Sequence, residues 1–464
     1  MSAPAPLLVY GLGRSGGAVV ARARRAGTPV LFFEQRGEGP DVDAALADGA
    51  QRVLGIEEAL RHDPVPRTCV AAPGVPIDHP DLEQLRAAGV ETIGEVVWVL
   101  RAMPARCVGV TGTAGKGTVT RWITDGLLAA GVDAVAGGNI VPALAAVARP
   151  EATLVIELSS FQLERAPGLR PDVAVVLNLG VDHLDRHGTV AAYHEAKRAL
   201  LRELGPAQTL VGNADDPRVA AWLDASPARV RRFSLAAPTD AFLERDAGQL
   251  WLDGAPLVGV DDLRVAGEHQ IANALATALA LEACGVPRET IARALAAFAG
   301  LPGRYAEVGR LAGVRFIEDS IATRPLAVEA ALRATPGPLV WIAGGVDKGA
   351  DVDALGPLLR DRVALTLGVG ASGPAYAAAA SRYAPAEVIA EPDGRAALRT
   401  AARRAWRELR DRHGGHGAVL LAPLAASFDQ FRDYAERAAV FREVVAELAR
   451  DATADEGVTW TPSS

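Results

Sequence analysis

Residues 110–118 read Val-Thr-Gly-Thr-Ala-Gly-Lys-Gly-Thr. The short apolar run 107–110 before them predicts a buried parallel strand, and residues 119–130 carry apolar side chains at helical spacing. A glycine-rich turn between a strand and a helix brings backbone N–H groups and a helix N-terminus to one point, which attracts phosphate. Lys116 adds a mobile positive charge for the β- and γ-phosphate oxygens. The stretch therefore predicts an ATP phosphate loop.

This loop departs from the strict phosphate-loop pattern at two positions. Val110 stands where the pattern has a glycine, and Gly117 stands where it has the Ser or Thr that reaches magnesium. An ordinary glycine-rich turn of an α/β protein is the alternative interpretation, and the stretch alone leaves both open.

Lysine is scarce in this chain. Of the 48 basic residues Lys and Arg, three are lysines, at positions 116, 197 and 348. A lysine is a compact ammonium that can lose its proton and react, whereas arginine is a wide planar fork that stays charged. A chain with this bias is expected to keep lysine where arginine would fail, so Lys197 and Lys348 are candidate site residues. Chance placement is the alternative.

Length and composition limit the class of protein. A chain of 464 residues is expected to form two to four domains, and a formal net charge of −8 argues against nucleic-acid binding. The three cysteines are far apart and lack metal-binding spacing, which is typical of reduced thiols in the cytoplasm. We expect no signal peptide and no membrane insertion, because no suitable apolar stretch is found.

The first block of the chain resembles a nucleotide-binding βαβ unit. Strands are expected at 7–10 and 30–33, joined by the turn 11–16 and a helix that ends near residue 25. Glu34 stands where a dinucleotide enzyme places an acidic residue, so NAD binding is an open alternative. The block is expected to end near Gly94.

The second block places polar residues at the ends of two predicted strands, 153–156 and 173–177. Glu157 follows the first, and Asp182 and His183 follow the second. Ligands of parallel α/β sheets lie at the carboxyl ends of strands, so these groups are expected beside the phosphate loop, where they suit a divalent metal on ATP. The alternatives are a residue beside a helix cap for Glu157 and simple loop packing for His183.

Two predicted helices of this block carry further candidates. Lys197 lies in a helix expected over 193–204, where neighbouring charges also fit an ordinary solvated lysine. Residues 267–273 open a long Ala-rich helix, and their polar side chains either bind a base or cap the helix.

The third block repeats the α/β rhythm after residues 301–304, which read as a linker. Strands are expected at 339–342, 365–367 and 418–421, with Lys348 at the mouth of the sheet and a frayed tail from about Asp451. The predicted fold is α/β with three domains: a Rossmann-like domain over 1–94, a phosphate-loop ATPase domain with a mostly parallel sheet over 95–299, and a Rossmann-like domain over 300–464.

Several motifs, taken together, resemble the Mur ligase family over nearly the whole chain. They occur at 111–116 (Thr-Gly-Thr-Ala-Gly-Lys), 157–163 (Glu-Leu-Ser-Ser-Phe-Gln-Leu), 182–185 (Asp-His-Leu-Asp), 267–273 (Gly-Glu-His-Gln-Ile-Ala-Asn), 301–304 (Leu-Pro-Gly-Arg), 319–323 (Asp-Ser-Ile-Ala-Thr) and 427–431 (Ser-Phe-Asp-Gln-Phe). The motifs at 157–163 and 427–431 resemble those of the member that adds D-glutamate to UDP-N-acetylmuramoyl-L-alanine.

The resemblance implies an ATP-dependent amide ligase of peptidoglycan precursor synthesis in the cytoplasm, which we expect to act as a monomer. ATP phosphorylates the carboxylate of the precursor, the amine of glutamate attacks the acyl phosphate, and phosphate leaves. Two Mg²⁺ ions are expected to neutralise charge. Lys197 matches the family lysine that becomes carbamylated, a reaction that only a neutral amine allows.

The resemblance also assigns site residues. Catalytic roles fall to Lys116, Glu157, His183 and Lys197, and metal binding to Thr118, Glu157, His183 and carbamylated Lys197. ATP contacts fall to Gly112, Thr113, Gly115, Lys116, Gly117, Thr118, Asn273, Arg304 and Asp319. Substrate contacts fall to Arg14, Ser15, Gln35, Arg36, Gly74, Asn139, His183, Thr323, Lys348, Ser427, Phe428 and Phe431.

Four positions depart from the family pattern: Ala114, Gly117, Gln270 and Ile321. The first two motivate a catalytically idle relative that binds the precursor, and loss of a lysine at 321 leaves D- versus L-glutamate open. A dinucleotide oxidoreductase is a further alternative. A folyl-polyglutamate synthetase fits less well, because it lacks an N-terminal domain of this kind.

Overall fold

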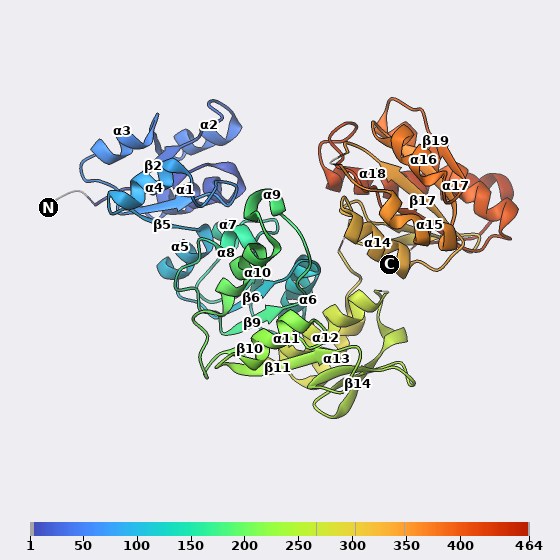
Figure 1. Ribbon diagram of the computed structural model, residues 1–464, viewed down its shortest axis with the longest axis horizontal. Helices are drawn as coiled ribbons and strands as arrows, with labels where there is room; N and C mark the ends of the chain where they lie inside the picture. Colours follow the sequence, from blue (N-terminus) through green and yellow to red (C-terminus); the bar gives the residue numbers. More distant parts are fainter. Residues whose placement is uncertain (1–3, 266, 302, 348, 463–464) are drawn as a thin grey trace. The chain divides into compact units, whose positions relative to one another are not determined.

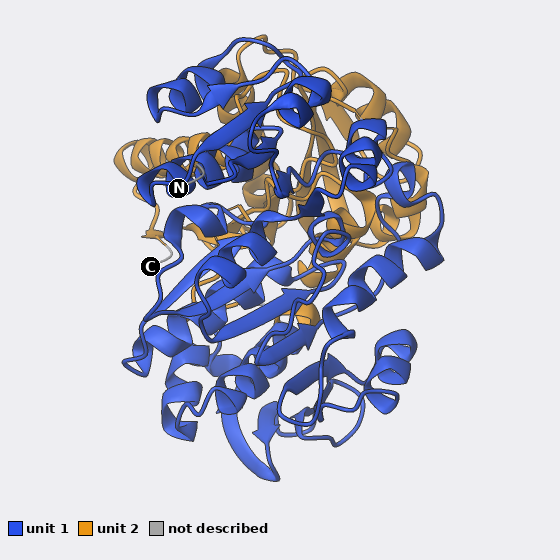
Figure 2. Ribbon diagram, turned by 90° about the vertical axis from the view of Figure 1, so that its left-hand side faces the viewer, with its two compact units in different colours: residues 1–263, 271–297 blue, residues 264–270, 298–464 orange. Residues whose placement is uncertain are grey.

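The computed structural model describes residues 4–265, 267–301, 303–347 and 349–462. The chain divides into two compact units, which Figure 2 shows in different colours. Figure 1 labels the helices and strands along the chain. Unit 1 comprises residues 1–263 and 271–297, and unit 2 comprises residues 264–270 and 298–464.

Unit 1 begins with a five-stranded sheet formed by residues 7–93 of the described chain, in the order β3-β2-β1-β4-β5. Neighbouring strands are parallel, as short apolar strands joined by helices require. The elements are β1 (Leu7–Tyr10), α1 (Gly13–Arg25), β2 (Val30–Phe33), α2 (Pro40–Ala47), β3 (Gln51–Arg52), α3 (Ile56–Arg61), β4 (Thr68–Ala71), α4 (Pro80–Ala87) and β5 (Glu91–Ile93). The predicted Rossmann-like arrangement of this block is confirmed.

The second sheet of unit 1 has the order β14-β13-β12-β11-β10-β9-β6-β8-β7 within the described residues. In this order, the neighbouring strands from β12 through β6 to β7 are parallel, and β13 and β14 add an antiparallel hairpin. The strands are β6 (Cys107–Thr111), β7 (Ala134–Gly138), β8 (Thr153–Glu157), β9 (Val173–Val176), β10 (Thr209–Asn213), β11 (Arg229–Ser234), β12 (Ala241–Glu244), β13 (Gln249–Leu252) and β14 (Ala255–Gly259). The helices are α5 (Glu95–Ala102), α6 (Lys116–Ala129), α7 (Leu144–Val147), α8 (Ser160–Leu163), α9 (Leu184–His187), α10 (Val190–Arg198), α11 (Pro217–Asp224), α12 (Glu268–Ala283) and α13 (Arg288–Ala297).

Unit 2 contains a sheet in the order β19-β18-β17-β20-β16-β15-β21 within the residues described. Its strands from β19 to β16 are parallel, whereas β15 pairs antiparallel with both β16 and β21. The strands are β15 (Ala306–Leu311), β16 (Val314–Glu318), β17 (Leu339–Gly344), β18 (Val363–Val369), β19 (Ala386–Val388), β20 (Ala418–Leu421) and β21 (Trp460–Pro462). The helices are α14 (Pro325–Ala334), α15 (Gly356–Arg362), α16 (Gly373–Ala380), α17 (Gly394–Arg412) and α18 (Tyr434–Glu456).

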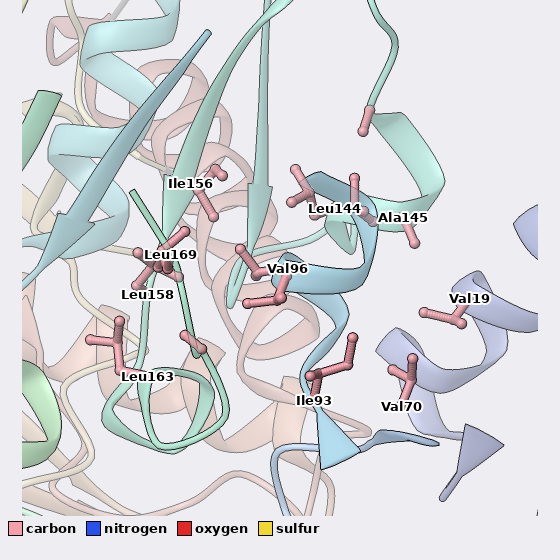
Figure 3. Packing of buried hydrophobic residues seen from close by; sticks show 14 of the residues in the cluster. Val19, Val70, Ile93, Val96, Leu144, Ala145, Ile156, Leu158, Leu163 and Leu169 are labelled. Atoms are coloured by element: carbon pink, nitrogen blue, oxygen red, sulfur yellow. The ribbon is translucent and has the colours of Figure 1, made fainter. Parts of the chain in front are cut away.

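One core joins the two sheets of unit 1. Val19 of α1, Val70 of β4, Val96 of α5, Leu144 of α7 and Ile156 of β8 belong to the same buried cluster (Figure 3). Helices α5 and α7 therefore fill the space between the sheets, and the expected boundary at residue 94 separates two sheets but not two cores.

Two expectations about elements are wrong. The helix expected over 193–204 runs from Val190 to Arg198 and continues as a 3-10 turn, Ala199–Leu201. The tail from Asp451 is not frayed, because α18 extends to Glu456 and β21 pairs with β15. Of the expected linker 301–304, Pro302 lies outside the described residues. No helix among those described is long and apolar enough to span a membrane.

Candidate functional site

The phosphate-loop stretch connects β6 to α6. Gly115 has φ +84° at the N-cap of α6, a left-handed conformation that favours glycine. A Cβ atom at this position would lie 2.5 Å from Oδ1 of Asn273, so the loop passes close to α12. The glycine therefore serves both the turn and the approach of Asn273, a predicted ATP contact.

The loop is held by the end of strand β9. Asn178 accepts a hydrogen bond from the Ala114 N–H at its side-chain oxygen (2.8 Å) and from the Thr113 N–H at its backbone oxygen (2.9 Å). The Thr113 hydroxyl in turn accepts from the Gly180 N–H (2.8 Å). Sequence reasoning assigned no role to Asn178, although a polar residue directly after a buried strand is the signal that identified Glu157.

Lys116 folds back over the loop. Its Nζ donates to the carbonyl oxygens of Gly112 (2.9 Å) and Thr113 (3.0 Å). The side chain thus lies over the loop, where a phosphate would be bound.

Lys197 is buried, with 1% of its surface exposed. Its Nζ donates to the Gly112 carbonyl oxygen at 2.8 Å and lies 4.7 Å from the ring centre of Tyr193. Burial and the positive charge of Lys116 lower the pKa of Lys197 to about 6, against the opposing attraction of Glu157. The interpretation as a solvated surface lysine is therefore wrong, and the amine is mostly neutral at pH 7.

Glu157 ends strand β8 and is 3% exposed. Its Oε1 accepts a hydrogen bond from Nδ2 of Asn139 at 2.7 Å. Its Oε2 is buried and has no hydrogen-bond partner among the described residues. A buried carboxylate oxygen without a donor fits a cation ligand.

His183 follows strand β9 with φ +52°, an unusual conformation for a residue other than glycine. Its ring packs against Phe161 with ring centres 4.7 Å apart, and its Nε2 lies 3.4 Å from Oδ2 of Asp182. Burial lowers the pKa of His183, which favours the neutral imidazole that a metal requires.

Thr118 is buried in the first turns of α6. Among the described residues, no group of three or more His, Cys, Asp or Glu side chains is placed to hold a metal ion. Mg²⁺ is commonly held by one or two carboxylates together with phosphates and water, so this arrangement fits a nucleotide-bound ion.

The first sheet carries the candidates for the nucleotide end of a precursor. Arg14 and Ser15 lie at the start of α1, and Gln35 and Arg36 are exposed after β2. Both carboxylate oxygens of Glu34 are occupied: Oε2 accepts from the Leu12 N–H (2.8 Å) and Oε1 accepts from the backbone and side chain of Arg36. Glu34 therefore holds the glycine-rich turn together and is not free for a ribose, which disfavours NAD binding.

Unit 2 carries the remaining described candidates. Asp319 follows strand β16 and is 8% exposed, and burial together with the charge of Glu318 raises its pKa to about 7. Phe428 is 70% exposed, whereas its neighbour Ser427 is 2% exposed. The Ser427 carbonyl oxygen accepts a hydrogen bond from the Phe431 N–H at 2.8 Å. Arg304 and Thr323 are partly exposed in the same unit, and Lys348 lies outside the described residues.

Arg437 of α18 is a residue that sequence reasoning missed. It is 3% exposed and donates to the carbonyl oxygens of Ser320 (2.8 Å), Ala425 (3.1 Å) and Gly344 (3.4 Å). These carbonyls lie at the carboxyl ends of β16, β20 and β17. One buried guanidinium therefore holds together the loops that carry Thr323 and Ser427.

Comparison with known proteins defines the class. Residues 110–281 match the model of the Mur ligase middle domain. The UDP-N-acetylmuramate–alanine ligase of Thermotoga maritima has the same fold, with a TM-score of 0.58 at 18% identity over 96% of this chain and 99% of that one. The MurF ligase of Thermotoga maritima, solved in complex with ADP, gives a TM-score of 0.59 at 18% identity over 91% and 96%. These neighbours have the three-domain fold.

Two relatives match nearly the whole chain. One, from Thermus thermophilus, is 46% identical over 98% of this chain and 99% of its own length. Another, from Deinococcus radiodurans, is 42% identical over 95% and 92%. The chain belongs to the Mur ligase family, whose members are ATP-dependent ligases. Both relatives are named UDP-N-acetylmuramoylalanine–D-glutamate ligase.

Proposed function

We propose that this protein joins D-glutamate to UDP-N-acetylmuramoyl-L-alanine, with ATP hydrolysed to ADP and phosphate. The observation that carries the proposal is the meeting of the phosphate loop, Lys116, Lys197 and the buried Oε2 of Glu157, which has no donor within the described part of the chain. The names of the relatives supply the identity of the substrates.

The reaction begins with transfer of the γ-phosphoryl group to the precursor carboxylate. The loop amides from Gly112 to Thr118 and the Lys116 ammonium bind the β- and γ-phosphates. Carboxylate oxygen is a poor leaving group, and phosphorylation makes it a good one. The amine of glutamate then attacks the acyl carbon, loses a proton, and the C–O bond to phosphate breaks as the amide forms.

Magnesium fits the donors of this site. Glu157 through Oε2, neutral His183 and the Thr118 hydroxyl would hold it together with phosphate oxygens. When bound, Mg²⁺ supplies charge neutralisation between the phosphates and the precursor carboxylate. Gly117 offers no hydroxyl at the usual position, so a water molecule is expected to replace it.

Lys197 would contribute as a carbamate. A neutral amine adds CO₂ with release of one proton, which converts a cation into an anion in a site that contains Lys116. Its lowered pKa of about 6 supports this, because the neutral form predominates at pH 7 to 8. The resulting carboxylate would be a further metal ligand.

The proposed substrate contacts follow the family resemblance, residue by residue. Arg14, Ser15, Gln35, Arg36, Gly74 and Asn139 are proposed for the precursor, and Thr323, Lys348, Ser427, Phe428 and Phe431 for glutamate. Asn273, Arg304 and Asp319 are proposed for ATP. We also propose domains over 1–94, 95–299 and 300–464, and a monomer, which light scattering of the purified protein tests.

Phosphate release tests the proposal directly. With ATP and Mg²⁺ present, release should require both the precursor and D-glutamate, and L-glutamate in its place should give little. Equal release with L-glutamate would contradict selectivity for D-glutamate, and release with L-glutamate alone would reverse the assigned stereochemistry. Precursor binding without release of phosphate with either isomer would instead identify a catalytically idle relative, which the departures Ala114 and Gly117 motivate.

A further inference from the structure

Two arginines bind the turn that follows strand β4. Arg186 donates from Nη2 to the Val75 carbonyl oxygen (2.9 Å) and from Nη1 to the Gly74 carbonyl oxygen (3.4 Å). Arg165 also donates from Nη2 to the Val75 carbonyl oxygen. The turn belongs to the five-stranded sheet, whereas both arginines belong to the segments around the nine-stranded sheet.

These arginines lie next to the phosphate-loop site along the chain. Arg186 is in α9, which begins directly after His183. Arg165 comes two residues after the end of α8, and α8 follows strand β8, which ends at Glu157. The Arg186 guanidinium carbon lies 5.0 Å from the ring centre of Phe161, the ring that packs against His183.

A carboxylate fixes the direction of the Arg186 side chain. Glu164 accepts from Nη2 of Arg186 at 2.8 Å through Oε2, and its Oε1 lies 3.3 Å from Nδ1 of His187. The other ring nitrogen of His187 lies 3.0 Å from the Ser160 hydroxyl. Arg186 and Glu164 are each 13% exposed, so this pair is largely shielded from solvent.

Arg165 is more deeply buried, with 2% of its surface exposed. Its own carbonyl oxygen accepts from the Gly94 N–H at 2.8 Å, and a Cβ atom on Gly94 would lie 3.1 Å from that oxygen. Burial lowers the pKa of the Arg165 guanidinium to about 10. A buried cation is retained at a cost, which is consistent with a specific task for its hydrogen bond to the turn.

We propose that Arg186 and Arg165 are positioning residues that hold the 74–75 turn in a fixed place relative to His183 and Glu157. The inference rests on the proposed function, in which Gly74 contacts the precursor. The nucleotide end of the precursor would then meet a turn that is already ordered against the site that phosphorylates its carboxylate. Pre-ordering lowers the entropic cost of binding, so its loss should weaken precursor affinity rather than ATP affinity.

The first test substitutes Arg186, which is less deeply buried than Arg165, with alanine. Affinity for UDP-N-acetylmuramoyl-L-alanine, measured by calorimetry without ATP, should fall about tenfold, as expected for loss of hydrogen bonds from a charged donor. The KM for the precursor should rise in parallel, whereas kcat and the KM for ATP should change less than about twofold. Hydrogen exchange of the peptide over residues 72–79 should become faster in the unliganded protein.

Further variants separate positioning from general stability. Arg186→Lys keeps the charge but loses the fork that spans two carbonyls and Glu164, so precursor affinity should lie between wild type and Arg186→Ala. Arg165→Met should give the same selective loss of precursor affinity. Arg232→Ala removes a partly exposed ion pair with Asp224, elsewhere in unit 1, and should leave precursor affinity unchanged.

The outcomes are distinct. If Arg186→Ala leaves both the precursor affinity and the hydrogen exchange of residues 72–79 unchanged, the positioning role is overturned. Turnover by the wild-type protein would still support the proposed function in that case. An equal loss of precursor and ATP affinity would show a general structural defect and would also overturn it. If wild type itself bound no precursor, the proposed function would fail, and this inference with it.

Discussion

Lys197 and Lys116 donate to the same acceptor, the carbonyl oxygen of Gly112, at 2.8 and 2.9 Å. Burial penalises the charged form of Lys197, and repulsion by the nearby Lys116 ammonium adds to that cost. Lys197 therefore has the lowered pKa. The main chain of the phosphate loop thus holds the buried Lys197 amine, with its lowered pKa, beside the Lys116 side chain.

Replacing Lys197 with alanine should lower phosphate release by about a hundredfold, because the proposed carbamate ligand of the metal is removed. A small carboxylate such as acetate should restore part of the activity, whereas bicarbonate alone should not. Arg198→Ala, which removes an exposed neighbour, is the matched control and should behave as wild type. Full activity of Lys197→Ala would refute a role for the carbamate.

Gly115→Ala should raise the KM for ATP by about tenfold or more, because the added Cβ strains the loop and meets Asn273 at 2.5 Å. Gly131→Ala is the control: φ there is +75° but no atom lies within 4 Å of the added Cβ. It should lower stability by about 1 kcal/mol through backbone strain alone and leave the KM for ATP unchanged. Similar ATP kinetics for both variants would argue against close packing at the loop.

Glu95 should make the stability of unit 1 depend on pH. Burial raises its pKa from 4.5 to about 7, against the lowering effect of backbone hydrogen bonds from Ala145 and Leu144, and its second oxygen has no hydrogen-bond partner among the described residues. The native state then binds more protons than the unfolded state between these values, so the free energy of unfolding should fall as pH rises from 4.5 to 7, by about 3 kcal/mol. Urea unfolding of Glu95→Gln should show a flatter profile over this range, and an unchanged slope would contradict the assignment.

Arg437→Met should destabilise unit 2 by about 3 kcal/mol, because three buried carbonyl oxygens lose a charged donor. The KM for glutamate should rise as the loops after β16, β17 and β20 loosen. Arg432→Ala is the control, since its ion pair with Glu436 is exposed and is expected to contribute about 0.5 kcal/mol or less. Equal midpoints of urea unfolding for the two variants would count against the role of Arg437.

Much of the fold follows from local signals. Short apolar strands ending in polar residues predict parallel sheets with a site at their carboxyl ends, and Glu157 and His183 occupy such positions. The glycines of the phosphate loop predict its strand-turn-helix conformation, and Gly115 adopts it. These features depend on neighbours in sequence, so the sequence is sufficient to predict them.

Other features depend on which elements pack together. Lys197 has the charged neighbours of an exposed helix, yet its side chain is on the buried face of α10, and helical spacing alone does not reveal which face is covered. Arg437 resembles any arginine of a surface helix until three strand ends meet around it. Asn178 gains its role only when β9 lies beside β6.

The pairing of β21 with β15 has a consequence for the order in which unit 2 is completed. Strand β15 comes first in its sheet along the chain, and its outer neighbour, Trp460–Pro462, comes last. A growing polypeptide therefore exposes one side of β15 to solvent until translation has passed residue 462. During that interval the nascent chain is vulnerable to edge-to-edge association with other copies. Once β21 has paired with β15, this edge is covered, and the aromatic ring of Trp460 packs over Gly309.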